Sequence, residues 1–380
     1  MSRNNFLSFA QSVTEALAQN PAFEKLTGLA QNANLNKAVE MPLLAFATVR
    51  SAHYTVQYEM LNRISARIPG LKAPNYLADL AANEHVREEV VRLLKADVQN
   101  AVNGYYPITV FQPENPLRHA RRMARIFLDG IGIYRRRATH EARKFSKQAR
   151  EHFDGVPDYY KRNFHFQTDG YLSENSAELY EHQVELLFGG TANAMRRLLL
   201  KPMKEHFRDN PDGEGLTFLE LGAGTGTATR NVRLAFPKAR IVVTDLSEPY
   251  LRAARRNLEA FDRLDYVRAD AADLPFAGEK FDAVYSVFTL HETPLEARKA
   301  ILKEAARVLK KGGFLGVVDS AQLGDVPQID DVLKNFPTNF HEPFYMNYIK
   351  TPLEKLLKTI RLKVGRSEVG LFSKVVWAVK

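Results

Sequence analysis

Short β-rich runs alternate with helical segments along the C-terminal half of the chain. Five of these runs are expected to be strands: Leu216–Leu221, Ile241–Thr244, Leu264–Arg268, Phe281–Phe288 and Gly313–Val318. Alternation of strands with helices predicts a parallel, doubly wound sheet. Two final runs, at 362–369 and 374–379, are separated by a short turn containing glycine and predict a closing hairpin. We therefore expect an α/β fold with a Rossmann-like sheet of seven strands, five parallel plus the C-terminal hairpin.

The first 155 residues follow a helical pattern instead. Apolar residues from Tyr76 to Val98 recur at about 3.6 positions, with Asn75 as the expected cap and Asn103-Gly104 as the expected stop. A second helical stretch follows three prolines and is expected to break around Gly130–Gly132. We expect a mainly α-helical N-terminal domain over 1–155, an aromatic lid with linker helices over 156–215, and the sheet-containing domain over 216–380.

A glycine-rich loop stands where the first strand turns into the next helix. It reads Glu220-Leu-Gly222-Ala223-Gly224-Thr-Gly226, and its glycines let the backbone pass close to a ligand at the carboxyl edge of the sheet. The dinucleotide fingerprint would require its third glycine at position 227, where this chain has Thr. This spacing, with an acid beside the loop, favours a cationic ligand over a pyrophosphate.

Acidic residues follow the next two strands. Asp245 ends the second strand, where a carboxylate can accept hydrogen bonds from both hydroxyls of a ribose. Asp270, after the third strand, would lie near the amine of an adenine. The alternative for Asp245 is an ordinary helix cap. Three candidate sites at three successive strand ends together favour an adenosine-type ligand.

These motifs resemble those of class I S-adenosylmethionine-dependent methyltransferases. From about Leu216 to Lys380 the chain is most similar to the type 11 small-molecule group, which includes the ubiquinone and menaquinone C-methyltransferases. The resemblance implies S-adenosylmethionine as cofactor. It implies that Glu220 and the loop hold the methionine end, Asp245 the ribose, and Asp270 with the Ala271 backbone the adenine. The expected cofactor site also includes Leu246 and Phe288.

The fourth strand should end beside the first and face the reactive carbon of the cofactor. His291 follows this strand and is the candidate general base, oriented by Glu292. Alternatively, the two residues only cap and solvate the helix after Pro294. Methyl transfer can also proceed by placement and desolvation without a base.

Two aromatic segments flank the sheet domain. Residues 159–171 are expected to form a lid in which Tyr160, His165 and Tyr171 contact the substrate. The alternative is that these aromatic residues attach the N-terminal helices to the core. A similar cluster at 340–345 lies where this family builds acceptor specificity.

Composition narrows the chemistry further. The chain has 380 residues and no Cys, which excludes disulfides, thiolate zinc sites and a cysteine nucleophile. No metal site is predicted. No apolar run reaches the roughly 18 residues of a membrane-spanning helix, and no signal peptide is apparent, so a cytoplasmic location is the expectation.

The positive charge is concentrated in one segment. Residues 118–150 hold 11 Lys or Arg against two acids, and this excess equals the net charge of +9 of the whole chain. A solvated helix face is one interpretation, and attraction to anionic lipid head groups is another. Nucleic acid is less favoured, since no RNA-binding module or motif for base amines is present.

The sequence thus predicts a methyltransferase acting on a small apolar or aromatic acceptor, such as a quinone, phenol or lipid. One alternative is an RNA or protein methyltransferase that docks through segment 118–150. Another is a non-catalytic S-adenosylmethionine-binding scaffold. Turnover distinguishes the scaffold from the enzymes, because only an enzyme releases S-adenosylhomocysteine.

Overall fold

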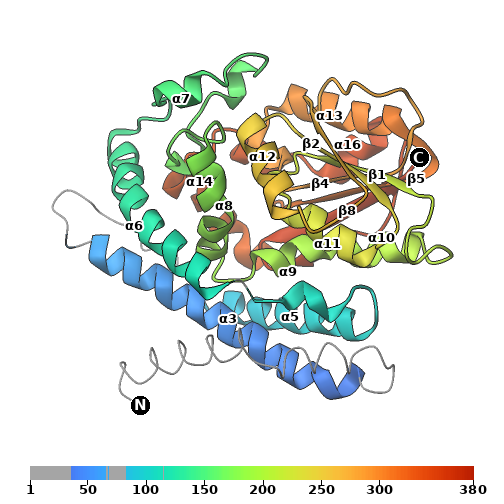
Figure 1. Cartoon of the computed structure of the whole chain (residues 1–380), viewed down its shortest axis with the longest axis horizontal. Helices are drawn as coiled ribbons and strands as arrows, with labels where there is room; N and C mark the ends of the chain where they lie inside the picture. Colours follow the sequence, from blue (N-terminus) through green and yellow to red (C-terminus); the bar gives the residue numbers. More distant parts are fainter. Residues whose placement is uncertain (1–35, 66, 68–82, 114) are drawn as a thin grey trace. The chain divides into compact units, whose positions relative to one another are not determined.

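The computed structural model describes residues 36–65, 67, 83–113 and 115–380 (Figure 1). The chain divides into two compact units. Unit 1 runs to Ile131 and includes His182–Ala194, and unit 2 comprises Gly132–Glu181 with Met195–Lys380. The sequence-based boundaries at 155 and 215 both fall inside unit 2, and as boundaries of folding domains they stay a prediction.

Unit 1 is helical in its described part, as expected. Helix α3 (Asn36–Ser65) packs against α5 (Glu84–Val102), which is followed by the 3-10 turn η1 (Ile108–Phe111). Helix α5 begins where the Asn83 side chain accepts a hydrogen bond from the Val86 amide, and it ends at Asn103 as predicted. The predicted cap Asn75 and the apolar positions 76–80 lie outside the described residues.

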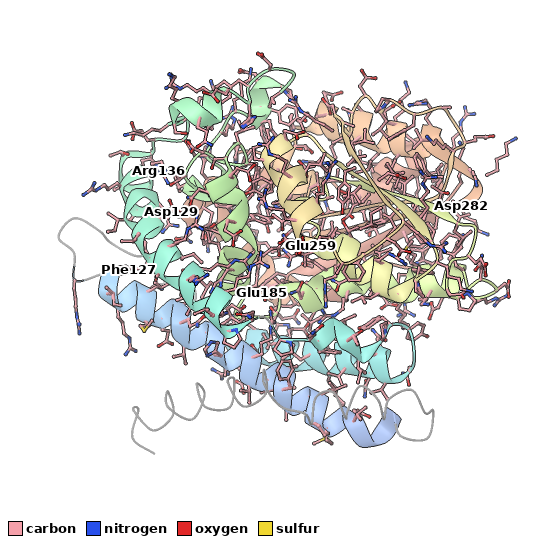
Figure 2. All side chains as sticks on the ribbon, in the orientation of Figure 1. Phe127, Asp129, Arg136, Glu185, Glu259 and Asp282 are labelled. Carbon is pink, nitrogen blue, oxygen red and sulfur yellow. The ribbon has the colours of Figure 1, made fainter. Side chains whose placement is uncertain are left out.

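Helix α6 (Pro116–Thr139) corrects one expectation, because it continues through Gly130–Gly132 without a break. A glycine weakens a helix by about 1 kcal/mol but does not end it. Arg136, labelled in Figure 2, covers the gap beside Gly132, where an added Cβ would lie 3.2 Å from its Nη1. Its Nε donates to the Phe166 carbonyl at 2.8 Å and so ties the end of α6 to the segment that follows.

Unit 2 holds the sheet and its flanking helices. Its strands are β1 (Thr217–Leu221), β2 (Arg240–Asp245), β3 (Leu264–Arg268), β4 (Phe281–Val287), β5 (Leu309–Ser320), β6 (Lys363–Val364), β7 (Glu368–Gly370) and β8 (Ser373–Val379). The main helices after the lid segment are α8 (Glu174–Leu187), which crosses the division between the units, α10 (Leu200–His206), α11 (Thr227–Ala235), α12 (Glu248–Asn257), α13 (Leu295–Val308), α14 (Asp330–Asn339), α15 (Tyr345–Lys350) and α16 (Leu353–Thr359). Short helical pieces are α7 (Lys147–Arg150), α9 (Ala192–Arg196), η2 (Asp158–Tyr160), η3 (Phe164–Phe166), η4 (Arg197–Leu199), η5 (Leu290–Glu292) and η6 (Pro327–Ile329).

The strand order is β3-β2-β1-β4-β5-β8-β6, and β7 also pairs with β8. The first five strands are parallel, which confirms the doubly wound sheet. Strands β1 and β4 are parallel neighbours. From β1 the strand order runs outward to β3 on one side and to β5 on the other, so the topological switch point lies between β1 and β4. Such a switch point opens a crevice at the carboxyl ends of the strands. The fold therefore places a ligand site beside the loops after β1 and β4.

The closing hairpin corrects the strand count from seven to eight. The expected strand at 362–369 is two strands, β6 and β7, which both pair antiparallel with β8. Gly365 lies in the interruption, where an added Cβ would stand 2.2 Å from the Trp377 ring. Its amide still donates to the Trp377 carbonyl at 2.8 Å, so pairing with β8 extends through Gly365 at the start of the interruption that separates β6 from β7.

Helices cover both faces of the sheet (Figure 1). Helices α11 and α12 pack on β2, with α10 against α11, whereas α13 packs on β5 and contacts α16. The strands between them are almost continuously buried, as parallel strands covered on both faces require. At the amino ends of the strands, Asp282, labelled in Figure 2, accepts from the Thr217 amide at 2.9 Å and from Lys310 at 2.8 Å.

The basic segment 118–150 is largely solvent-exposed. Eight of its 11 Lys and Arg residues are exposed, whereas Arg122 and Arg136 are buried. Across the described residues, no helix is both long and apolar enough to span a membrane.

Candidate functional site

A cleft lies at the carboxyl ends of β1, β2 and β4, entirely within unit 2. It holds about 710 Å³ of empty space, counting the part open to solvent. Its lining combines the loop after β1, three acids and a group of aromatic rings: Gly222, Gly224, Asp245, Asp270, Glu292, Tyr159, Tyr160, Tyr171, Tyr180, Tyr250 and Phe288. The sheet edge that the sequence indicated is therefore hollow.

The glycine loop is shaped by close approach of its backbone to neighbouring strands. Gly222 has a φ of +66°, and an added Cβ would lie 2.6 Å from the Thr289 Oγ1 after β4. Ala223 donates its amide to the Thr244 carbonyl at 2.9 Å, and Gly226, at φ +86°, caps α11. Gly222 and Gly224 line the cleft, whereas Ala223 and Gly226 do not.

Asp245 connects the ends of β1 and β2. Its Oδ2 accepts from the Gly224 amide and its Oδ1 from the Ser247 amide, both at 2.7 Å. It is not the cap of α12, since Ser247 takes that role by accepting from the Tyr250 amide. Burial raises the pKa of Asp245 to about 6, against the opposing effect of the two amides. The Asp245 carboxylate therefore both lines the cleft and holds the glycine loop through Gly224.

Glu220 lies deeper than the sequence analysis expected. It is 1% exposed, is not part of the cleft lining, and accepts hydrogen bonds from the Thr229 hydroxyl and, at 3.0 Å, from the Tyr285 hydroxyl. Burial raises its pKa to about 8, more than these hydrogen bonds lower it. The neutral acid is therefore the main form at pH 7 in the structure as it stands.

The remaining expected cofactor residues lie around the cleft. Leu246, Asp270, Ala271 and Phe288 all line it. Asp270 accepts from the Ala272 amide at 2.8 Å, which fixes the turn after β3. Phe288 has a φ of +56°, so β4 ends one residue earlier than predicted, and the ring of Phe288 lies 5.6 Å from the Arg196 guanidinium.

His291 is buried behind the cleft lining and forms a pair with Asp319 at the end of β5. Its Nδ1 lies 2.6 Å from Asp319 Oδ1, and its Nε2 lies 3.8 Å from Glu292 Oε1. The orientation expected from Glu292 therefore comes from Asp319. Burial lowers the pKa of His291, but the Asp319 carboxylate outweighs it and the net shift is upward. Neither His291 nor Glu292 caps α13, which follows Pro294 without a side-chain cap.

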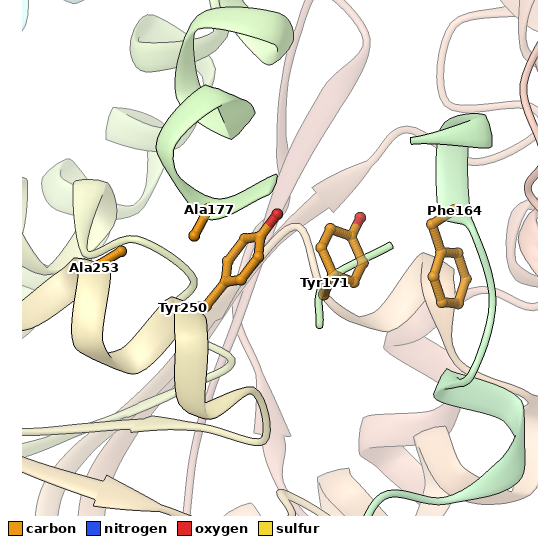
Figure 3. Close-up of a cluster of buried hydrophobic side chains, with 5 residues drawn as sticks. All are labelled: Phe164, Tyr171, Ala177, Tyr250 and Ala253. Atoms are coloured by element: carbon orange, nitrogen blue, oxygen red, sulfur yellow. The ribbon is translucent and has the colours of Figure 1, made fainter. Parts of the chain in front are cut away.

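The lid segment packs on α12 through aromatic rings. Figure 3 shows Tyr250 beside Ala177 and Tyr171, with Phe164 beyond, and the rings of Phe164 and Tyr171 stack at 5.5 Å. Tyr160 packs against the same cluster and, with Tyr171, lines the cleft. These aromatic residues therefore form part of the wall of the site as well as a packing core.

His165 lies outside the cleft lining, in a buried group with two carboxylates. Its Nε2 is 3.0 Å from Glu342 Oε1 and 3.4 Å from Glu292 Oε1. Glu292 also accepts from the Tyr171 hydroxyl, which joins this group to the cleft.

Among the residues that sequence reasoning missed as individuals are Tyr180, Tyr250 and Thr289 in the cleft lining, and Asp319 and Glu342 beside it. Asp319 carried a weak signal, because it stands at the carboxyl end of a predicted strand run, the same signal that selected Asp245 and Asp270. Glu342 lay within the aromatic cluster at 340–345. Tyr180 and Thr289 carried no signal, since their roles depend on contacts with distant elements.

Comparison with known proteins agrees with this geometry. Residues 218–313 match a family model described as a methyltransferase domain. Among curated relatives, a demethylmenaquinone methyltransferase from Clavibacter sepedonicus is 46% identical over 105 residues, covering 28% of this chain and 41% of the relative. A ubiquinone/menaquinone biosynthesis C-methyltransferase from Rhizobium meliloti is 38% identical over 128 residues, covering 32% of this chain and 48% of the relative.

A third relative, a fatty-acid O-methyltransferase from Mycolicibacterium smegmatis, is 31% identical over 156 residues, covering 41% of this chain and 56% of the relative. The chain thus spans about half the length of the curated relatives it matches. A solved S-adenosylmethionine-dependent methyltransferase from Aquifex aeolicus is 21% identical with a TM-score of 0.36, covering 48% of this chain and 91% of that one. Residues 218–313 thus match a methyltransferase domain, a class of domain whose cofactor is S-adenosylmethionine.

Proposed function

We propose that the protein transfers the methyl group of S-adenosylmethionine to a small acceptor with an apolar or aromatic body. One observation carries the proposal: the cleft combines the glycine loop, two strand-end acids and a wall of tyrosines at the switch point of the sheet. The named relatives act on a quinone precursor or a fatty acid, which supports an acceptor of this type.

The donor set fits the cofactor part by part. Asp245 would accept from the ribose hydroxyls, and Asp270 with the Ala271 backbone would hold the adenine. Leu246 and Phe288 line the same cleft. The loop Gly222–Gly226 would pass along the methionine end, with Glu220 behind it. When bound, the cofactor supplies an electrophilic methyl group on a sulfonium.

The protein's contribution would be placement and exclusion of water. Tyr160 and Tyr171 line the cleft and would contact the acceptor. His165 is joined to this wall through Glu292, which accepts from the Tyr171 hydroxyl. His291, held by Asp319, is the proposed base. Because it does not line the cleft, it would take the acceptor proton through Glu292, which lines the cleft and whose Oε1 lies 3.8 Å from the His291 Nε2.

Calorimetric titration with S-adenosylmethionine and S-adenosylhomocysteine tests the cofactor site. We expect binding of both ligands by the purified chain, at least about tenfold weaker binding by Asp245→Ala, and none of NAD. The binding protein is then incubated with quinols, phenols and fatty acids, and release of S-adenosylhomocysteine is measured. Binding that is unchanged by Asp245→Ala contradicts the assigned site, and binding without turnover on any acceptor favours the scaffold alternative.

A further inference from the structure

Beside the cleft, three chemically matched side chains meet that the proposed methyl transfer does not require. His165 comes from the lid segment, Glu292 from η5 after β4, and Glu342 from the loop after α14. One nitrogen or oxygen of each lies within 4.8 Å of the others. A histidine nitrogen and two carboxylates are ligands that first-row divalent metal ions accept.

The spacing fits one ion. Two ligands bonded to a metal at about 2.1 Å, with angles between octahedral and tetrahedral, stand about 3.0 to 3.4 Å apart. The His165 Nε2 lies 3.0 Å from Glu342 Oε1 and 3.4 Å from Glu292 Oε1. The histidine nitrogen therefore stands from each carboxylate oxygen at the separation of two ligands that share one ion, and the ligand atoms of all three side chains lie within 4.8 Å of one another.

The environment of Glu342 points to a missing cation. Its residue is 3% exposed, and both carboxylate oxygens are buried without a hydrogen-bond donor, although His165 lies within ion-pair distance. A buried carboxylate in this state is costly unless a proton or a cation neutralises it.

A second buried histidine in this region is already paired. His291 pairs with Asp319, because its Nδ1 lies 2.6 Å from the Asp319 Oδ1. It therefore does not compensate the charge of Glu342. His165 can neutralise one of its two carboxylate neighbours when protonated, but not both. A divalent ion would compensate both carboxylates and leave the histidine neutral, as metal ligation requires.

We propose that His165, Glu292 and Glu342 bind a divalent first-row transition-metal ion next to the cofactor cleft. Glu292 lines the cleft, so a free coordination position of the ion would face the acceptor side. If the proposed methyl transfer is correct, this position would hold an oxygen of the acceptor, such as a phenolate or carboxylate, and would favour its ionised form. The substrate class then narrows to acceptors with a metal-binding oxygen.

Metal binding itself is the test, so it does not depend on methyl transfer. The full chain without an affinity tag is treated with chelator, dialysed and titrated with Mn²⁺, Co²⁺ or Zn²⁺ by calorimetry. We expect one ion per chain, and at least about tenfold weaker binding in Glu342→Gln and in His165→Asn. Asparagine is chosen because His165 has a φ of +53°, a conformation that asparagine tolerates.

Glu88→Gln is the matched control, because Glu88 is an exposed carboxylate that also stands near a histidine, 3.9 Å from the His85 Nδ1. This variant should bind the ion as the unmodified chain does. Less than one ion per unmodified chain overturns the site, and so does binding that both cluster variants retain. Binding of S-adenosylhomocysteine and circular dichroism are measured on each variant, so loss of the fold or of the cofactor site is recognised separately. If either Glu342→Gln or His165→Asn fails to fold, the metal affinity of the other variant tests the site.

Discussion

At the residue scale, burial determines what the acids of the cleft can do. Glu220 lies near the end of β1 and Asp245 is the last residue of β2, so both are at the same edge of the sheet. Asp245 lines the cleft, whereas Glu220 does not. Glu220 has the higher pKa, because only two hydroxyl donors offset its desolvation, whereas Asp245 accepts from two backbone amides.

Replacing Glu220 by Gln should change how stability depends on pH. The pKa of Glu220 rises from 4.5 to about 8 on folding, so the folded chain keeps a proton that the unfolded chain releases. Its contribution is fully present below about pH 4.5 and is lost as the pH rises to about 8, by about 1.4 kcal/mol per pH unit. Urea unfolding at several pH values between 4.5 and 8 measures the free energy of unfolding of both proteins. This free energy should fall more steeply with pH in the unmodified chain than in Glu220→Gln. Parallel curves for the two proteins would contradict the raised pKa.

Replacing His291 by Gln tests the proposed base. The change should leave the affinity for S-adenosylhomocysteine within about threefold, because His291 does not line the cleft. Turnover should fall by about 10² to 10⁴, the usual contribution of general acid–base catalysis. Steady-state kinetics with an accepted substrate measures kcat and KM separately. A turnover number equal to that of the unmodified enzyme would show that placement alone suffices.

At the scale of elements, the loop after β1 depends on its neighbours on both sides. The Thr225 hydroxyl donates to Glu181 of α8 at 2.6 Å, and the Asn257 amide of α12 donates to the Thr225 carbonyl at 3.0 Å. Two helices and the end of β2 therefore hold one short turn. Gly222 and Gly224 within it differ in what surrounds them.

The pair Gly222→Ala and Gly224→Ala should separate packing from ligand contact. Both positions have a positive φ, at +66° and +59°, which costs alanine roughly 1–2 kcal/mol. A Cβ at 222 also meets Thr289 at 2.6 Å, whereas one at 224 meets nothing within 4 Å. We expect the larger loss of unfolding free energy for Gly222→Ala, and for Gly224→Ala mainly weaker cofactor binding.

Chemical denaturation and calorimetry of both variants measure the two effects. Equal destabilisation by the two substitutions would mean that the contact with Thr289 relaxes without cost.

At the scale of the whole molecule, the cofactor site is contained in one compact unit. Every residue that lines the cleft belongs to unit 2, and so do His165, Glu342 and Asp319. The sheet, the lid segment and the helices after β5 therefore act together on a ligand, although the lid and the last helices are far apart in the chain.

S-Adenosylhomocysteine should stabilise the chain against heat. A ligand at 100 times its dissociation constant adds about 2.7 kcal/mol to the folded state, which raises the Tm of a unit of this size by several degrees, about 5–10 °C. Differential scanning calorimetry of the chain with and without the ligand measures the shift. The Asp245→Ala variant and NAD serve as controls, and an equal shift in either would place the binding elsewhere.

The sequence alone determined the parallel sheet, the position of the cleft and the class of the cofactor. These follow from local patterns: strand runs, a glycine loop with its own spacing, and acids at successive strand ends. Parallel strands bring such ends to one edge whatever the rest of the chain does, so Gly222, Asp245 and Asp270 could be assigned to one site before any contact was known.

Tertiary structure decided the rest. The division of the expected strand at 362–369 into β6 and β7 appears only in the pairing with β8, and the orientation of His291 comes from Asp319, 28 residues away. His165, Glu292 and Glu342 meet although no local pattern connects them, and the sequence predicted no metal site. Burial and pKa depend on which distant side chains surround a group. The depth of Glu220, and the buried carboxylate oxygens of Glu342 that lack a hydrogen-bond donor, therefore appear only once the chain has folded.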